Sequence, residues 1–235
     1  MGSGKVLPIR ALPRFFIPGA LLADGPVELG PEDWKKVHNV LRLSSGDQIA
    51  ILPNDGSIWR CTLQGHSAVP VEQSRPGTES PRQVTLCVAY LKGEKLEDVI
   101  RRGSEIGVSE FVLFSADRSV VKWDAKKLAD RDRRWQAIAR EACELSYRTQ
   151  LPSLRYEPTL KAVLQKYPTA QVLSEVESET QRMQVQPEMV LVVGPEGGWS
   201  PKEVELIGEN AITLGPRVLS ADAAALSACA LALLT

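Results

Sequence analysis

The order of apolar and polar residues along this chain predicts short strands in its first third. Apolar runs at residues 48–52 and 58–63 flank a turn that contains Asp55 and Gly56, a pattern typical of a β-hairpin. Residues 32–41 form the single helical segment of this region, with apolar side chains at helical spacing. The N-terminal part therefore predicts a small β-barrel.

A polar stretch at residues 71–82 separates this region from the rest of the chain. It contains Pro76, Gly77 and Pro81 and has no apolar period, which is typical of a linker. We therefore predict two domains, at residues 1–74 and 83–235.

Strands and helices alternate after the linker. Apolar, strand-like runs lie at residues 84–91, 111–114, 172–173, 189–193 and 212–214. Apolar residues at helical spacing mark three helices: one through Leu96, Val99, Ile100 and Gly103, one through Trp135, Ile138, Ala142 and Leu145, and one at residues 223–234. This alternation predicts an α/β domain with a mostly parallel sheet.

The charge balance narrows the partners that can be expected. Twenty-eight basic and twenty-nine acidic residues give a net charge of −1, which excludes a uniformly basic surface for nucleic acid. A local surplus remains, because residues 118–148 hold nine Lys or Arg and five Asp or Glu. Arg14 lies directly before Phe15 and Phe16, and aromatic rings beside arginines suit RNA, although both rings also suit a barrel core.

Cysteine and histidine usage argues against metal and disulfide chemistry. The four cysteines are widely spaced and the chain has only two histidines, so a metal site is not expected. Dispersed cysteines suit a reducing compartment. The N-terminus has no continuous apolar core, and the longest uncharged stretch, residues 223–235, is too short for a bilayer. We expect a cytoplasmic protein with no membrane partner.

Two glycine-containing turns follow predicted strands and precede predicted helices. The first contains Gly194, Glu196 and Gly197, and Ser200 with Glu203 forms a capping-box pattern after it. The second contains Leu214 and Gly215 and leads to Asp222. Ligands of α/β sheets bind at the carboxyl ends of strands, so both turns predict a ligand site, with tight structural turns as the alternative.

Six segments in order resemble the RsmE family of SPOUT-class methyltransferases. The segments are Arg14-Phe15-Phe16, residues 38–42, residues 92–107 with Lys95, Glu105 and Gly107, residues 118–152, residues 194–198 and residues 214–219. Members of this family transfer a methyl group from S-adenosylmethionine to N3 of a uridine in 16S, small-subunit ribosomal RNA. The resemblance covers nearly the whole chain.

The resemblance implies a fold that periodicity does not reveal. It implies an N-terminal PUA-like β-barrel that binds RNA and a C-terminal SPOUT-type domain whose parallel sheet carries a trefoil knot. It also implies a homodimer that acts on ribosomal RNA or the small ribosomal subunit, with no metal.

The resemblance also implies site residues. Those for S-adenosylmethionine are Leu173, Gly194, Glu196, Gly197, Leu214, Gly215, Arg217 and Leu219. Those for RNA are Arg14, Phe16, Arg42, Lys92, Lys95 and Arg118. Arg148 is expected to bind the target phosphate or a developing oxyanion, and Glu196 and Asp222 to orient the base or accept its proton.

Two other functions remain open at this stage. Ser220, Asp222 and Leu145 stand where the family usually has Arg, Glu and Gln, which keeps a non-catalytic RNA-binding or ribosome-assembly protein of the same fold as an alternative. A dinucleotide-dependent oxidoreductase would need G-x-G-x-x-G after the first strand of the α/β domain, but residues 91–95 read Leu-Lys-Gly-Glu-Lys.

Overall fold

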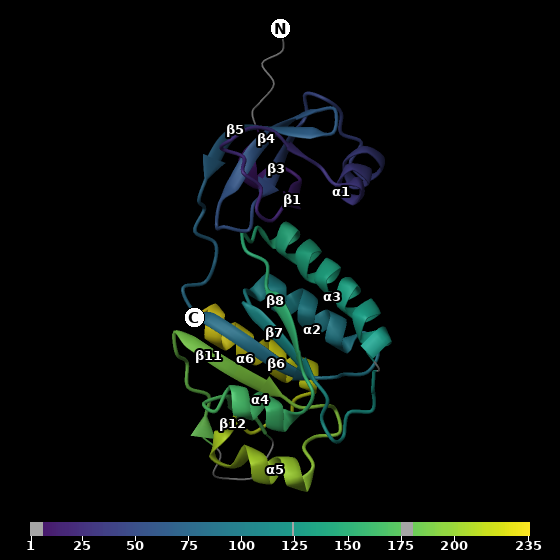
Figure 1. Cartoon of the computed structure of the whole chain (residues 1–235). Helices are drawn as coiled ribbons and strands as arrows, with labels where there is room; N and C mark the ends of the chain where they lie inside the picture. The colour runs from purple at the N-terminus through teal and green to yellow at the C-terminus, as the bar shows by residue number, and fades with distance from the viewer. Residues whose placement is uncertain (1–6, 124, 175–180) are drawn as a thin grey trace. The chain divides into compact units, whose positions relative to one another are not determined.

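The computed structural model divides into two units, each built on its own sheet (Figure 1). It describes residues 7–123, 125–174 and 181–235. The first unit contains the chain up to Glu79 together with Cys143–Gln150, and the second contains Ser80–Ala142 and Leu151–Thr235. The sequence had assigned residues 143–150 to the C-terminal domain, but their contacts place them in the first unit.

The first unit has a curled, mostly antiparallel sheet in the order β1-β3-β4-β5-β2. Among its described strands, β1 and β3 pair in parallel and the other neighbours pair antiparallel. Its strands are β1 (Arg14–Phe16), β2 (Val27–Glu28), β3 (Gln48–Leu52), β4 (Ile58–Gln64) and β5 (Ser67–Ser74). The predicted hairpin is confirmed, with Asn54 and Gly56 at positive φ between β3 and β4. The linker prediction was wrong for residues 71–74, which pair with β4 as the end of β5.

The helical segment of the first unit changes geometry along its length. The predicted helix at 32–41 is confirmed as α1 (Pro31–Lys35), which continues as the π-helical turn η2 (Lys36–Val40). A short 3₁₀ turn, η1 (Ile9–Ala11), precedes β1. The core of the unit is apolar and consists of Phe15, Leu22, Leu29, Val37, Ile49, Ile51, Cys61, Leu63 and Ala68.

The second unit has a seven-stranded sheet in the order β10-β12-β9-β11-β6-β7-β8, and every pairing is parallel. This confirms the predicted parallel α/β sheet. Its strands are β6 (Gln83–Ala89), β7 (Glu110–Phe114), β8 (Ser153–Glu157), β9 (Gln171–Leu173), β10 (Gln181–Arg182), β11 (Glu188–Val193) and β12 (Ala211–Thr213).

Helices cover both faces of this sheet. They are α2 (Lys95–Ile106), α3 (Ala125–Ser146), α4 (Leu160–Lys166), α5 (Pro201–Ile207), the 3₁₀ turn η3 (Gly208–Asn210) and α6 (Ala221–Leu233). One core cluster joins the sheet to α2, α3 and α6, and the other joins it to α4 and α5. Successive residues of β6 belong to opposite clusters, Leu86 to the first and Cys87 to the second, because side chains alternate along a strand.

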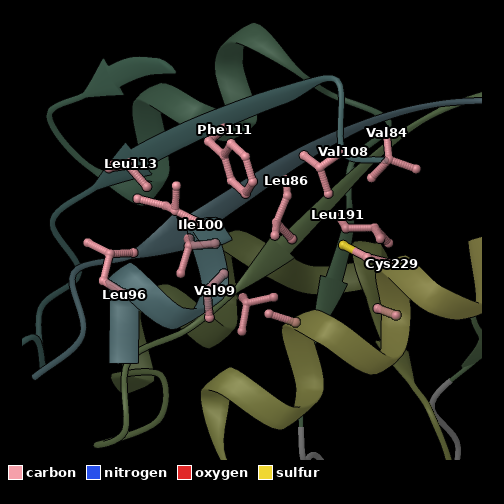
Figure 2. Packing of buried hydrophobic residues seen from close by; sticks show 14 of the residues in the cluster. Val84, Leu86, Leu96, Val99, Ile100, Val108, Phe111, Leu113, Leu191 and Cys229 are labelled. Atoms are coloured by element: carbon pink, nitrogen blue, oxygen red, sulfur yellow. The ribbon is translucent and has the colours of Figure 1, made fainter. Parts of the chain in front are cut away.

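The first core cluster shows why α2 has a glycine at the predicted helix face. Leu96, Val99 and Ile100 of α2 belong to this cluster together with Phe111 of β7 (Figure 2). A Cβ on Gly103 would lie only 3.0 Å from the Phe111 ring, so the residue without a side chain lets the helix approach the sheet. Burial of each such apolar side chain contributes about 1.5–3 kcal/mol.

Helix α3 follows its predicted face until its last turn. Trp135 and Ala142 are buried as expected, whereas Leu145 is 69% exposed. At the end of the helix a different face is buried, the one that carries Cys143 and Glu144. The reason is that these residues contribute to the first unit.

All four cysteines, Cys61, Cys87, Cys143 and Cys229, are buried and not disulfide-bonded. Burial raises the pKa of the Cys61, Cys143 and Cys229 thiols to about 12, and it raises the pKa of Cys87 as well. Among the described residues, no helix has the length and apolar character to cross a membrane. The same residues hold no group of three His, Cys, Asp or Glu that could bind a metal.

Candidate functional site

Most of the predicted site residues follow the carboxyl ends of neighbouring parallel strands. Lys92 and Lys95 follow β6, Arg118 follows β7, Gly194, Glu196 and Gly197 follow β11, and Leu214, Gly215, Arg217, Leu219 and Asp222 follow β12; Leu173 ends β9. Because β12, β9, β11, β6 and β7 are adjacent in the sheet, these residues share one edge, which we call the carboxyl edge.

The turn after β11, residues 194–198, is held in place by contacts with neighbouring segments of the chain. Trp199 donates from its indole Nε1 to the carbonyl of Leu173 at 2.9 Å, and its ring covers Gly194, whose Cβ would lie 2.9 Å from Trp199 Cε2. A Cβ on Gly197 would lie 3.1 Å from Arg118 Cβ. These two glycines therefore give room to a tryptophan and an arginine of the chain itself.

Polar contacts of Glu196 and Arg118 complete this attachment. The Lys92 amide donates to Glu196 Oε1 at 3.0 Å, and Arg118 donates to the Gly197 carbonyl at 3.2 Å. Both side chains are exposed. The turns after β6, β7 and β11 are thus joined by hydrogen bonds around an accessible carboxylate and an accessible guanidinium.

A buried carboxylate fixes the start of α5. The predicted capping box is confirmed: the Ser200 amide donates to Glu203 Oε2 at 2.9 Å, and the Glu203 amide donates to Ser200 Oγ at 3.3 Å. Glu203 Oε1 also accepts from the Asp117 amide at 2.9 Å, and Ser200 Oγ donates to Asp117 Oδ2 at 2.6 Å. Sequence reasoning missed Asp117, because its partners are more than eighty residues away.

The turn after β12, residues 214–219, has mostly local contacts. Thr213 Oγ1 accepts from the Gly215 amide at 3.1 Å, and Gly215 adopts a φ of 140° with no atom within 4 Å of the place where a Cβ would stand. Arg217 is exposed, and Leu173, Leu214 and Leu219 are half-buried. This turn presents open backbone and apolar side chains to the carboxyl edge.

Asp222 lies in the first turn of α6, two residues after the N-cap residue Ser220. Its Oδ1 lies 3.3 Å from Lys95 Nζ. Burial raises the pKa of Asp222, but its own backbone amide, Ser220 and Lys95 outweigh that effect and leave the pKa below its usual value. The carboxylate is therefore charged at neutral pH, beside a lysine that follows β6.

Three predicted site residues of the first unit, Arg14, Phe16 and Arg148, are engaged in contacts within that unit. Arg148 is buried, and its Nε and Nη2 donate to Glu79 Oε2 at 3.0 and 2.9 Å. Glu79 also accepts from the Thr149 amide at 2.7 Å, so the pair anchors the chain after α3. These contacts give Arg148 a structural role that does not require a substrate.

Arg14 and Phe16 also have structural roles. Arg14 donates to the carbonyls of Glu144 and Leu145, where the last turn of α3 has unsatisfied acceptors. Phe16 is only 1% exposed, which contradicts its predicted contact with RNA, because a buried ring has no face for a base. Arg42, by contrast, is exposed.

The basic stretch at 118–148 is partly neutralised. Arg134 donates to both oxygens of Glu97, at 2.6 and 2.7 Å, and Arg131 lies 3.4 Å from the same carboxylate. The hydrogen bond from Arg134 lowers the pKa of Glu97. Glu97 belongs to α2 and is itself buried. Through its carboxylate this part of α3 is attached to α2, although it is also exposed to solvent.

The comparisons with known proteins agree on one class. An RNA methyltransferase domain family matches residues 78–233. The chain is 34% identical over 218 residues to the ribosomal RNA small subunit methyltransferase E of Bacillus subtilis, covering 84% of this chain and 85% of that protein.

Solved structures give the same result. The ribosomal RNA small subunit methyltransferase E of Neisseria gonorrhoeae, solved with bound S-adenosylmethionine, is similar with a TM-score of 0.82 and 28% identity, over 94% of this chain and 96% of that one. A Legionella pneumophila methyltransferase solved with the same cofactor gives a TM-score of 0.85 and 28% identity, over 94% and 96% of the two chains.

Proposed function

This chain belongs to the ribosomal RNA small subunit methyltransferase E family, and we propose that it methylates N3 of a uridine in 16S ribosomal RNA. It is an S-adenosylmethionine-dependent methyltransferase of small-subunit ribosomal RNA. The observation that carries the proposal is the convergence of Leu173, the last residue of β9, with the turns after β11 and β12 on one edge of a parallel sheet. No finding favours the non-catalytic alternative, which remains an outcome of the test below.

The carboxyl edge fits S-adenosylmethionine in its chemistry. Gly198 and Gly215 have positive φ and open space beside them, so a ligand can approach their backbone closely. Leu173, Leu214 and Leu219 are half-buried and offer an apolar surface for an adenine ring. We propose that these groups hold the cofactor together with Arg217 and Glu196, whereas Gly194 and Gly197 act by admitting Trp199 and Arg118.

Alignment is the main contribution that these residues make to the reaction. When bound, S-adenosylmethionine supplies an electrophilic methyl group. Holding the reactants in the correct relative geometry lowers the activation barrier by about 7–11 kcal/mol, more than a single acid–base group contributes. Lys92, Lys95 and Arg118 follow the strands next to the cofactor turns, and we propose that they bind the phosphates around the target uridine.

One proton must leave uracil N3, and the carboxyl edge carries two carboxylates, Glu196 and Asp222. The lowered pKa of Asp222 makes it a weak base, so we assign Asp222 to orienting the base and the Lys95 side chain. Glu196 is the exposed carboxylate of the β11 turn, and we assign proton acceptance to it. The role of Asp222 follows from its charge, and the role of Glu196 follows from its exposure.

Arg148 requires a separate test, because its proposed contact with a phosphate or an oxyanion would break its pair with Glu79. If the role holds, Arg148→Ala should reduce methylation while leaving cofactor binding unchanged. Methylation at the native rate would remove Arg148 from the mechanism.

The experiment for the function has two measurements. At about 100 times its dissociation constant, S-adenosylmethionine should add roughly 2.7 kcal/mol to stability, or roughly 5–10 °C in melting temperature. Mass spectrometry of ribosomal RNA nucleosides should show N3-methyluridine in cells with the gene and none without it. A thermal shift without the modified nucleoside would support the non-catalytic alternative.

The finer architecture is also a proposal that rests on the family. We propose a trefoil knot in the second unit, closure of the first sheet into a PUA-like barrel, a homodimer, and a cytoplasmic location. The curled first sheet and the parallel second sheet support the two domain types. Sedimentation of the purified chain tests the dimer, and a monomeric mass would overturn it.

A further inference from the structure

An open groove in the first unit contains one of the predicted site residues, Arg42. Its volume is about 520 Å³, which is within the range of small-ligand sites. It is lined by Trp34, His38, Arg42, Leu43, Ser44, Ser45, Gly65 and His66. We call it the Trp34 groove.

Aromatic rings form one wall of the Trp34 groove. The His66 ring is stacked on Trp34, with centroids 4.1 Å apart and an interplanar angle of 23°. His38 stacks more loosely, with its centroid 6.0 Å from that of Trp34. Both histidines of the chain thus lie against one tryptophan, and both are exposed. Flat, accessible rings of this kind are a surface on which a nucleobase can stack.

The backbone beside these rings is unusual. The helix widens into a π-turn, in which the Leu41 amide donates to the Lys36 carbonyl at 2.9 Å. The chain then turns at Arg42, which adopts a φ of 55° that side-chain-bearing residues seldom take. Both features cluster at functional positions, because they hold a side chain where a regular helix would not.

Arg42 is the cationic group of the groove. Its side chain is exposed, and within the described residues its guanidinium has no ion pair or hydrogen bond. No Asp or Glu is among the eight residues that line the groove. An anion that enters would therefore meet the Arg42 guanidinium, while the nearby carboxylate of Asp47 accepts hydrogen bonds from Ser44 at 2.8 and 3.2 Å.

The turn between β4 and β5, which carries Gly65 and His66, is held in place by hydrogen bonds. The Gly65 amide donates to Ser45 Oγ at 2.9 Å, and the Leu29 amide donates to the His66 carbonyl at 3.0 Å. These bonds hold His66 against Trp34 without a ligand. The groove is therefore already formed, and ordering it adds little to the cost of binding.

We propose that the Trp34 groove is a nucleotide subsite for single-stranded RNA. A base stacks on the Trp34 and His66 rings, and the adjoining phosphate pairs with Arg42. The inference rests on the proposed function in one respect, since it takes the RNA to be the methylation substrate. The stack needs an unpaired base, so a duplex is not a ligand of this groove.

The first test maps the contact in the unaltered protein. The probe is a ten-nucleotide oligouridylate, cross-linked at 254 nm and followed by trypsin digestion and mass spectrometry. Cross-links should concentrate on peptides 15–35 and 61–82, which contain Trp34 and His66. Cross-links confined to other peptides would overturn the proposal.

The second test uses variants and the same oligouridylate, labelled for anisotropy at fixed salt. Arg42→Gly removes the guanidinium and suits the positive φ, and Trp34→Leu removes the ring while keeping an apolar side chain. Each should raise the dissociation constant about tenfold. The control Lys35→Ala removes one exposed charge from the same helix outside the groove and should change it less than about twofold.

Equal losses in all three variants, or equal affinity for an RNA duplex of the same length, would overturn the proposal. The thermal shift with S-adenosylmethionine is measured on the same variants. If the groove variants bind oligouridylate as tightly as the native chain and show a normal thermal shift with S-adenosylmethionine, the proposed subsite is rejected and the methyltransferase function stands. If the groove variants weaken oligouridylate binding but S-adenosylmethionine causes no thermal shift, the proposed function is rejected instead.

Discussion

The two glycine turns of the carboxyl edge have similar sequence patterns but different structures. Each follows a strand and precedes a serine-capped helix. The turn after β11 is held by Trp199, Arg118 and a buried carboxylate, whereas the turn after β12 has local hydrogen bonds and open space at Gly215. The comparison shows that long-range contacts hold the first turn in place, and we propose that the second turn is the side of the cofactor site that adapts to a ligand.

The largest effect should come from removing the buried carboxylate of the first turn. Glu203→Ala leaves the amides of Ser200 and Asp117 without their acceptor and should lower the free energy of unfolding by about 3 kcal/mol. Glu205→Ala, an exposed glutamate of the same helix, is the control and should cost less than about 0.5 kcal/mol. Urea denaturation measures both; equal midpoints would mean that the first turn is not fixed in this way.

Gly194 tests the close approach of Trp199. A methyl group at Gly194 would lie 2.9 Å from the indole, so Gly194→Ala should cost about 2 kcal/mol. In the background of Trp199→Leu the same change should cost much less, because the ring is gone. A double-mutant cycle by urea denaturation measures this coupling, and additive costs would contradict the packing account.

The two N-caps give a direct comparison of the turns. Ser200→Ala loses the cap and the hydrogen bond to Asp117 and should cost about 2 kcal/mol. Ser220→Ala loses an exposed cap, with a 3.4 Å contact to the Ala223 amide, and an exposed contact with Asp222, and should cost about 0.5–1 kcal/mol. Thermal melting ranks them, and a larger loss at Ser220 would reverse the assignment of fixed and adaptable turns.

The smallest effect concerns pH at the second turn. The folded pKa of Asp222 lies below its ordinary value of 3.8, so its contribution to stability is present above that value and is lost as pH falls through the folded pKa. Solvent screening keeps this contribution below about 1 kcal/mol. Urea midpoints between pH 5 and pH 2.5, compared for the native chain and Asp222→Asn, should converge on acidification; parallel curves would exclude the effect.

The sequence predicted most of the second unit because its strands are apolar on both faces and its helices have one apolar side. The capping box at Ser200 could also be predicted, since its two residues are three positions apart. Strand β8 and helix α4 were missed because β8 is mostly half-exposed and α4 is only seven residues long. The end of β5 was assigned to a linker because its side chains are exposed.

Individual site residues were harder to predict than the edge on which they lie. A run such as Arg14-Phe15-Phe16 fits RNA binding equally well with either ring outward, and only the fold shows that both rings are buried. Arg148 and Asp117 meet partners far along the chain, which no local pattern records. The Trp34 groove depends on the stacking of His66, in the turn between β4 and β5, on Trp34 of α1, so residue spacing gave no sign of it.

The burial of all four thiols has a practical consequence for studying this molecule in solution. Maleimides and spin labels react with thiolates, and groups with a pKa near 12 supply almost none at neutral pH. A single cysteine engineered on the surface should therefore take up a fluorophore selectively in the otherwise native chain. Motion of the second turn could then be followed during turnover without first replacing the natural cysteines.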